Sequence, residues 1–357
     1  MLRDSRMGLR AVVALFVLWF AAALPAIAQA PATDPAMKDL AAAQTKRGVD
    51  QPGNNAPVWR DVRSGDKSAY ASIPGREVNV LVQTEGQEWR ARRNGFWVIL
   101  SGWALVGLVV ILALAQWAIG TTYLQEPETG RKIQRFTNWE RWVHWSAAVS
   151  FSVLAISGLI MLFGKNILLP VIGYTLFSWL AAISKNMHNF LGPLFVVSVL
   201  VLVVTFIRDN FPKSYDLKWV LSLGGLIGGG HPPSGKFNGG EKIWFWGGAL
   251  VMGMSVGLSG LVLDFPNFDQ TRSTMQLANI VHLIAATLFM LGTMGHIYLG
   301  TLGVAGAYDG MRTGQVDETW AKQHHPYWYE DIKSGKIKGG SETVRPAAGQ
   351  PASGPAD

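Results

Sequence analysis

Two histidines, His282 and His296, lie within one long apolar segment near the end of the chain, at a spacing that could place both on one side of a membrane helix. Fourteen residues, at about 100° and about 1.5 Å each, return nearly to the same helix face and advance about 21 Å along the axis. An ionisable side chain at membrane depth is energetically costly and marks a candidate functional site. Because the hydrocarbon layer is about 30 Å thick, the two histidines indicate two sites, one near each leaflet.

Two further histidines, His144 and His188, begin apolar segments that precede this one. His144 enters its segment at the predicted cytoplasmic side, and His188 enters the next at the predicted outer side. The last segment crosses from outside to inside, so His282 is expected near the outer surface and His296 near the inner one. Matching depths predicts two pairs, His188 with His282 and His144 with His296.

Paired histidines, with no thiol or carboxylate at the same depth, suit a haem iron held on both faces. Two axial ligands leave no open coordination position, so such a centre carries electrons and does not bind oxygen. The chain has no cysteine, which excludes disulfides, thiolate zinc sites, cysteine-bound iron–sulfur clusters and haem attached through a CxxCH motif. The remaining histidines, His231, His324 and His325, are predicted to be loop or subunit-contact residues.

Two readings from other functional classes stay open at this point. In the first, the histidines line a path for divalent metal ions or protons, although a metal site would normally recruit Asp or Glu at the same depth. In the second, the protein is an assembly anchor and its histidines only pack.

Apolar segments of membrane-spanning length carry the histidines. The chain is 49% hydrophobic and only 15% charged, which leaves too few polar residues for a water-soluble surface. The sequence therefore predicts an all-α integral membrane protein, with a four-helix bundle and one extra N-terminal transmembrane helix that lacks histidine. The predicted spans are residues 96–120, 142–163, 188–207, 243–263 and 277–304.

Composition divides the chain into five regions. Residues 1–30 combine arginines, an apolar run and small residues, which predicts a secretory signal peptide. Residues 31–95 are too poor in apolar residues to form a large core and predict a periplasmic arm. Residues 96–120 form the extra transmembrane helix, residues 121–304 the four-helix domain, and residues 305–357 a cytoplasmic tail.

Basic residues in the connections predict the orientation. A formal charge of +7 could indicate nucleic acid, but most basic residues lie in short segments between apolar runs, which is a topology signal. Two connections are predicted to be cytoplasmic from their basic residues, which are Arg131, Lys132, Arg135 and Arg141 in one and Arg208, Lys213, Lys218, Lys236 and Lys242 in the other. The prediction is a multi-pass protein of the bacterial inner (cytoplasmic) membrane, in contact with membrane lipid and not with nucleic acid, with a periplasmic arm and a cytoplasmic C-terminus.

Six short stretches of the sequence form a more specific pattern. They are Val143-His144-Trp145, Met187-His188-Asn189, Val281-His282-Leu283, Gly295-His296-Ile297, Lys236-Phe237-Asn238-Gly239-Gly240-Glu241-Lys242 and His324-His325-Pro326-Tyr327-Trp328-Tyr329. This pattern, over about residues 135–333, resembles the gamma (cytochrome b) subunit of respiratory formate dehydrogenase. The signal sequence, the arm and the extra first span depart from the short form of that family.

The resemblance implies a transmembrane diheme cytochrome b within the four-helix bundle. Its outer haem b would be held by His188 and His282, and its inner haem b by His144 and His296. The depths of the histidines predict the same pairing.

The resemblance also implies a quinone site, for menaquinone or ubiquinone, beside Asn238 and Gly240 together with His296. An amide can hydrogen-bond a quinone oxygen, and a glycine lets the ring approach the backbone. In that family a catalytic alpha subunit and an iron–sulfur beta subunit are the partners, so electrons would pass from the periplasmic iron–sulfur partner through the outer and inner haems to quinone near the cytoplasmic face. The chain itself would anchor the complex and would hold no formate chemistry. A cytochrome b subunit of a quinone-reducing hydrogenase is the alternative with the same architecture.

Overall fold

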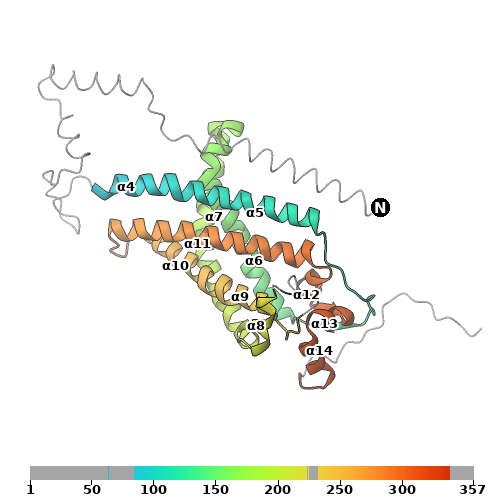
Figure 1. Ribbon diagram of the computed structural model, residues 1–357. Coiled ribbons are helices and arrows are strands. Elements are labelled where there is room, and N and C mark those ends of the chain that lie inside the picture. The colour runs from blue at the N-terminus through green and yellow to red at the C-terminus, as the bar shows by residue number, and fades with distance from the viewer. Residues whose placement is uncertain (1–62, 64–83, 223, 225–231, 338–357) are drawn as a thin grey trace, which may run out of the picture. The chain divides into compact units, whose positions relative to one another are not determined.

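Helices make up nearly all of the regular structure in the computed structural model, which describes residues 63, 84–222, 224 and 232–337 (Figure 1). The predicted signal peptide, most of the predicted arm, and His231 lie outside the described residues. The helical stretches that are long and apolar enough to cross a membrane are Glu88–Ala118, Asn138–Ile167, Leu169–Asn210, Gly239–Asp264 and Arg272–Gly303. The predicted all-α membrane fold is confirmed.

The chain divides into two compact units. Among the described residues, unit 1 comprises residue 63 and residues 84–106, 159–182 and 259–284. Unit 2 comprises the described residues 107–158, 183–222, 224, 232–258 and 285–337.

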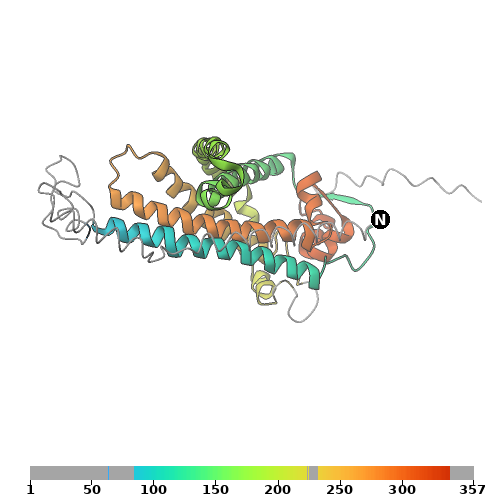
Figure 2. The same cartoon turned by 90° about the horizontal axis from the view of Figure 1, so that it is seen from above.

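Unit 1 packs the beginning of the first span against parts of two later helices. This span consists of α4 (Thr84–Arg92), the π-helical segment η1 (Arg93–Trp97) and α5 (Val98–Ala118). Within unit 1, α5 runs alongside α11 (Arg272–Tyr298), as both views show (Figures 1 and 2). The Arg93 Nε group donates a 2.9 Å hydrogen bond to Asn279 Oδ1. The buried apolar residues of the unit are Val98, Phe163, Ile167 and Leu283.

Unit 2 contains the larger helical core. It is built from parts of α6 (Asn138–Ile167), α7 (Leu169–Phe206), α10 (Gly253–Asp264) and α11, and from the π-helical segment η4 (Trp244–Met252). A β-carbon at Gly257 of α10 would lie 2.7 Å from Val196 Cγ2 of α7, so glycine permits the close approach of these helices. The buried residues of this core are Phe136, Phe195, Val199, Val203, Phe206, Phe245 and Phe289.

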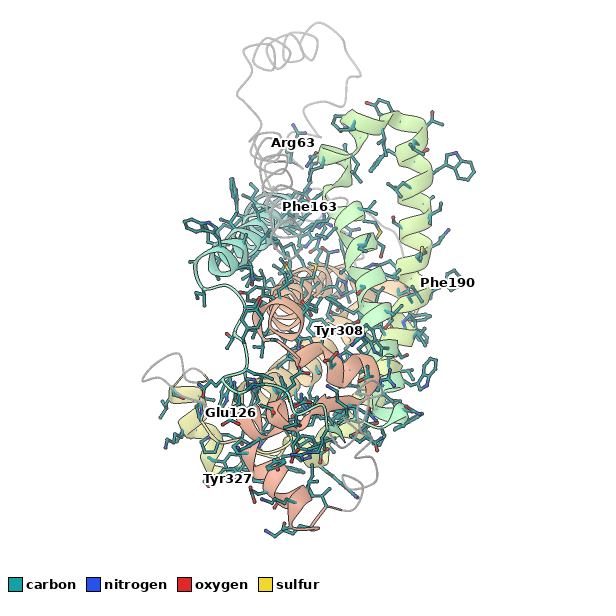
Figure 3. All side chains as sticks on the ribbon, turned by 90° about the vertical axis from the view of Figure 1, so that its right-hand side faces the viewer. Arg63, Glu126, Phe163, Phe190, Tyr308 and Tyr327 are labelled. Atoms are coloured by element: carbon teal, nitrogen blue, oxygen red, sulfur yellow. The ribbon has the colours of Figure 1, made fainter. Side chains whose placement is uncertain are left out.

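Helix α7 is long and irregular. Within unit 1 its helical geometry is interrupted at Gly173, where φ is 76°, a left-handed value that glycine adopts without strain. Within unit 2 it contains Pro193 and carries Phe190, which points outward and is 81% exposed (Figure 3). Such a ring is suited to contact with lipid. The helix is followed by η2 (Ile207–Asn210), α8 (Ser214–Leu221) and α9 (Gly239–Ile243).

Much of the predicted tail is folded within unit 2. After η5 (Leu299–Gly303) come α12 (Ala307–Thr313), strand β2 (Gln315–Asp317), α13 (Glu318–His324) and α14 (Pro326–Lys333). Strand β2 pairs antiparallel with β1 (Lys132–Gln134), which precedes α6. The buried side chains around this two-stranded sheet are Ile133, Val316, Trp320, Ala321 and Trp328.

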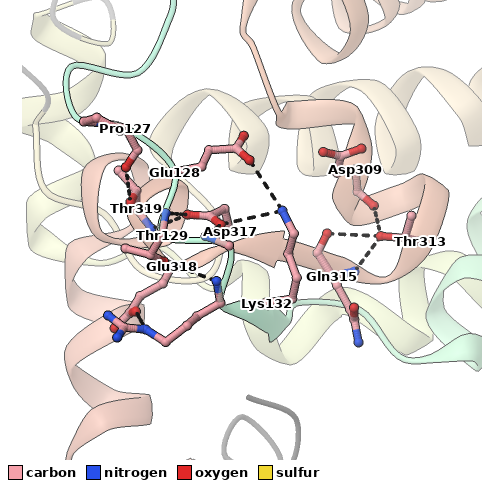
Figure 4. Close-up of polar contacts among 12 residues, drawn as sticks. Pro127, Glu128, Thr129, Lys132, Asp309, Thr313, Gln315, Asp317, Glu318 and Thr319 are labelled. Atoms are coloured by element: carbon pink, nitrogen blue, oxygen red, sulfur yellow. Dashed lines mark hydrogen bonds and ion pairs between the residues drawn. The ribbon is translucent and has the colours of Figure 1, made fainter. Parts of the chain in front are cut away.

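Asp317 joins the two strands and caps α13 (Figure 4). Its Oδ1 atom accepts hydrogen bonds from the backbone N–H groups of Thr319 (2.9 Å) and Thr129 (3.2 Å), and Oδ2 accepts one from Gly130 (2.9 Å). Lys132 Nζ lies 3.6 Å from the same carboxylate, which is 3% exposed. Basic residues used above to predict topology are therefore also paired with carboxylates near the C-terminal helices.

Candidate functional site

The structure of unit 2 brings His144 of α6 and His296 of α11 together. Their ring centroids are 6.2 Å apart, and the ring planes make an angle of 55°. Two imidazoles bound to opposite sides of one metal ion, with metal–nitrogen bonds of about 2.0 Å, have centroids about 6.3 Å apart. The observed spacing therefore fits a single ion held between the two rings.

His144 has a ring nitrogen that the protein leaves unsatisfied. Its Nδ1 atom is buried and has no hydrogen-bond partner among the described residues. A buried polar atom without a partner is destabilising, and a bound ligand can satisfy it. The adjacent Trp145 ring lies edge-on to the His144 ring at 5.4 Å, and its Nε1 group donates a 3.1 Å hydrogen bond to the backbone oxygen of Met311.

His188, also in unit 2, is oriented by a serine and a glycine of α6. Its Nδ1 atom lies 2.9 Å from Ser157 Oγ. A β-carbon at Gly158 would lie 3.3 Å from His188 Cε1, so the absence of a side chain there makes room for the ring. A histidine that ligates a metal usually forms a hydrogen bond through its other ring nitrogen, and the serine supplies that contact.

His282, in unit 1, has the same kind of surroundings. Its Nδ1 atom lies 3.3 Å from Ser259 Oγ of α10, and a β-carbon at Gly260 would lie 3.1 Å from its Cε1 atom. The tripeptide Ser-Gly-Leu occurs at residues 157–159 and again at 259–261. Neither serine was predicted as a contact of a histidine, although this repeat is a sequence signal that marks both.

Asn238 caps the N-terminus of α9. Its Oδ1 atom accepts a 2.9 Å hydrogen bond from the backbone N–H of Glu241, and the Glu241 carboxylate accepts a 2.8 Å bond from the backbone N–H of Asn238. This reciprocal capping box fixes the loop that enters the membrane segment. The side-chain oxygen of Asn238 is therefore engaged in the cap.

Gly240 is approached closely by an indole ring. A β-carbon at this position would lie 2.6 Å from Trp219 Cη2 and 2.8 Å from Cζ3, so any larger residue would displace the ring. Trp219 belongs to α8, which a buried ion pair, Lys242 Nζ to Asp216 Oδ2 at 2.7 Å, links to α9. The sequence predicted that a ligand would approach Gly240 and indicated no role for Trp219.

Charged side chains line the same end of unit 2. The Arg135 guanidinium is almost completely buried, 3.0 Å from the Glu241 carboxylate and stacked over the Trp320 ring at 4.9 Å. Lys236 Nζ lies 2.7 Å from both Glu140 and Asp209. The side chains around Asn238 thus form a fixed set of ion pairs.

His325 is buried next to this cluster and is 1% exposed. Its Nδ1 group donates a 2.7 Å hydrogen bond to the backbone oxygen of Gly235. Burial, together with the positive charge of Arg135, lowers the pKa of His325 to about 3. The imidazole is therefore neutral at physiological pH and links α13 and α14 to the loop at Gly235.

Within the described part of the chain, no three His, Cys, Asp or Glu side chains come together in a group that could hold a metal ion. A path for divalent metal ions would need such donor sets.

Comparison with known proteins identifies a family. The family model for prokaryotic cytochrome b561 matches residues 135–314, just over half of the 357 residues. The chain is 27% identical over 214 residues to the nitrate-inducible formate dehydrogenase cytochrome b556 subunit of Escherichia coli (strain K12). The aligned region covers 57% of this chain and 93% of the relative. It is 29% identical over 205 residues to a second formate dehydrogenase cytochrome b556 subunit of the same organism, covering 56% of this chain and 93% of that relative. The corresponding subunit of Haemophilus influenzae is 25% identical over 206 residues, which cover 55% of this chain and 81% of the relative.

Proposed function

Because this chain belongs to the prokaryotic cytochrome b561 family, we propose that it is the membrane electron-transfer subunit of a formate dehydrogenase. Membership of the family implies haem b and electron transport. The relatives described above are named as formate dehydrogenase subunits, which favours formate dehydrogenase over hydrogenase as the complex. The proposed partners are a catalytic subunit and an iron–sulfur subunit.

The spacing of His144 and His296 is the observation that carries this proposal. Their 6.2 Å separation fits two histidines that would together hold the iron of one haem b, the inner one. His188 and His282 are proposed as the ligands of the outer haem b, because the predicted depths match and a serine contacts the Nδ1 atom of each ring. Two haems per chain follow from this pairing.

The bound haems would supply one-electron transfer, relaying electrons between the periplasmic iron–sulfur partner and a quinone near the cytoplasmic face. The chain would hold each haem iron through two histidines, which would leave no coordination position for oxygen. It also contributes the serine contacts, which hold the ring nitrogens of His188 and His282 in place. The apolar helices around the ligands supply a low-dielectric medium.

We place the quinone site at Asn238 and Gly240, beside His296. The Oδ1 atom of Asn238 is engaged in the α9 cap, so the side-chain N–H group is the donor available to a quinone oxygen. Access to Gly240 would require movement of the Trp219 indole, which covers it. Protons taken up at the cytoplasmic face, with electrons entering from the periplasm, would generate a membrane potential.

The direct test is formate-driven reduction of the b-type haem in membranes that contain the whole complex. Formate should produce a reduced b-type absorption band in wild-type membranes. With His188→Ala or His282→Ala this band should be lost or greatly slowed, whereas His324→Ala should behave as wild type. An unchanged band in both outer-histidine variants would contradict the proposed electron path, and hydrogen replacing formate as the effective reductant would identify a hydrogenase.

A further inference from the structure

An indole ring lies between two rings of α11 in unit 2. The Trp244 indole is stacked on His296, with centroids 5.6 Å apart and planes 17° apart, and on Phe289, at 5.5 Å and 15°. Phe289 and His296 are seven residues apart, which places them on the same helix face about 10.5 Å apart along the axis. This axial distance is close to the sum of the Trp244–His296 and Trp244–Phe289 centroid distances, so the indole fills the space between the rings of His296 and Phe289.

Two glycines form the seat of the indole. A β-carbon at Gly292 of α11, between Phe289 and His296, would collide with Trp244 Cζ3. A β-carbon at Gly248, on the same segment as Trp244, would collide with Cε3. Trp244 also begins the π-helical segment η4. Turns of π-helix are rare in proteins, and those that occur are often found at functional sites. The position of the indole is therefore determined from both helices.

The four proposed ligand histidines differ in what holds their rings. Rotation of a histidine ring about χ2 is only weakly restricted by its own side chain, so an external contact must set its plane. Serine hydroxyls contact His188 and His282. Among the described residues the His296 ring makes no hydrogen bond, and the stacked Trp244 indole is the aromatic contact parallel to it. Offset stacking is a preferred aromatic geometry and can serve the same purpose.

We propose that Trp244 is a positioning residue for the inner haem, which holds the imidazole plane of His296 at its angle to His144. The inference rests on the proposed function, because it assumes that His296 is an axial ligand. The stack transmits the packing of Phe289, whose ring also contacts Phe151 at 4.7 Å, to the ligand. The 55° angle between the His144 and His296 planes is the quantity that Trp244 would set.

The test uses the purified complex with Trp244→Leu and Trp244→Phe, and with Trp246→Leu as the matched control. Trp246 is the nearby indole on η4; it donates a 2.8 Å hydrogen bond to Asn210 and stacks at an angle on Phe211. The readouts are haem content, the electron paramagnetic resonance spectrum of the oxidised haems, which is sensitive to the angle between axial imidazole planes, and redox potentials. The inner signal is identified as the one that His144→Ala removes.

Trp244→Leu should shift and broaden the inner-haem resonance and shift its potential, while the outer-haem resonance stays unchanged. Trp244→Phe should give a smaller shift, and Trp246→Leu should match the wild type. If Trp244→Leu does not assemble, the spectrum of Trp244→Phe provides the test. Gly292→Ala keeps every aromatic ring but displaces the Trp244 indole, so it should reproduce the change in the inner-haem resonance. Wild-type spectra in all Trp244 and Gly292 variants would overturn the inference alone, whereas a wild-type complex without b-type haem would overturn the proposed function.

Discussion

Acidification is expected to loosen the C-terminal helices of unit 2 through His325. In the folded protein its pKa is about 3, below the usual value of 6.5, because the ring is buried near the positive charge of Arg135. The unfolded segment therefore binds a proton first as the pH falls. The stabilisation is complete above about pH 6.5 and decreases as the pH falls from about 6.5 toward 3.

The magnitude follows from the shift. Each pH unit in this window costs about 1.4 kcal/mol, so lowering the pH from 6.5 to 5 should remove about 2 kcal/mol. The Nδ1 group already donates to the backbone oxygen of Gly235, so the added proton would occupy Nε2 inside the buried cluster. Because the ring of the open form is already half protonated at pH 6.5, the local opening of α13 and α14 should become about 16-fold more populated over this interval.

Limited proteolysis of the detergent-solubilised protein measures this opening, since cleavage follows the population of the open form when reclosing is fast. His325→Asn provides the comparison, because its amide can still donate to Gly235 but does not titrate. The variant should be cleaved faster than wild type at pH 7.5, yet its rate should change little between pH 6.5 and 5. An acid-induced increase in His325→Asn equal to that of wild type would refute the assignment, and His324→Asn should retain the wild-type increase.

Three further substitutions test other parts of the structure. Lys242→Met should lower the free energy of unfolding by about 3–5 kcal/mol, because it leaves Asp216 charged and buried. Asp216→Leu in the same chain should restore most of this loss. Thermal unfolding that is unchanged in Lys242→Met would show that the ion pair contributes nothing to stability. Asp317→Ala should destabilise the region of the small sheet by about 2–4 kcal/mol, since it removes a helix cap and leaves backbone N–H groups unsatisfied. Equal resistance of the variant and the wild type to proteolysis would contradict this predicted destabilisation. Ser157→Ala should weaken haem retention at the outer site about 10–100-fold, as loss of the hydrogen bond to a ligand histidine typically does. Ser152→Ala, which removes a hydroxyl bonded only to the backbone of its own helix, should leave haem retention unchanged. Equal haem contents of Ser157→Ala and wild type during dilution would argue against the role of Ser157.

The helices could be predicted from the sequence because their apolar runs have membrane-spanning length and contain few charged residues. Their ends could not. Helix α6 begins at Asn138, before the apolar run, because polar residues such as Glu140 can form the first turn at an interface. The pairing of β1 with β2 joins Ile133 to Val316 across the whole four-helix domain, and no local pattern indicates such a distant partner.

The part of the candidate site that could be predicted from the sequence is the proximity of two histidines at matching membrane depths. The depth argument paired His144 with His296, which the structure brings together. The contacts that orient the rings were not predicted, because a serine or a tryptophan in an apolar run does not show by itself which side chain it touches. Trp244 illustrates this limit, since its place depends on glycines of two helices and on a π-helical turn.

Haem content in single-histidine variants tests the central claim most directly. Redox-titrated difference spectra of the purified wild-type complex should show two b-type haems per copy of this chain. His282→Ala should remove one of them and His296→Ala the other, with His188→Ala matching His282→Ala and His144→Ala matching His296→Ala. A wild-type complex with no b-type haem, or variants in which His144→Ala and His296→Ala remove different haems, would contradict the account.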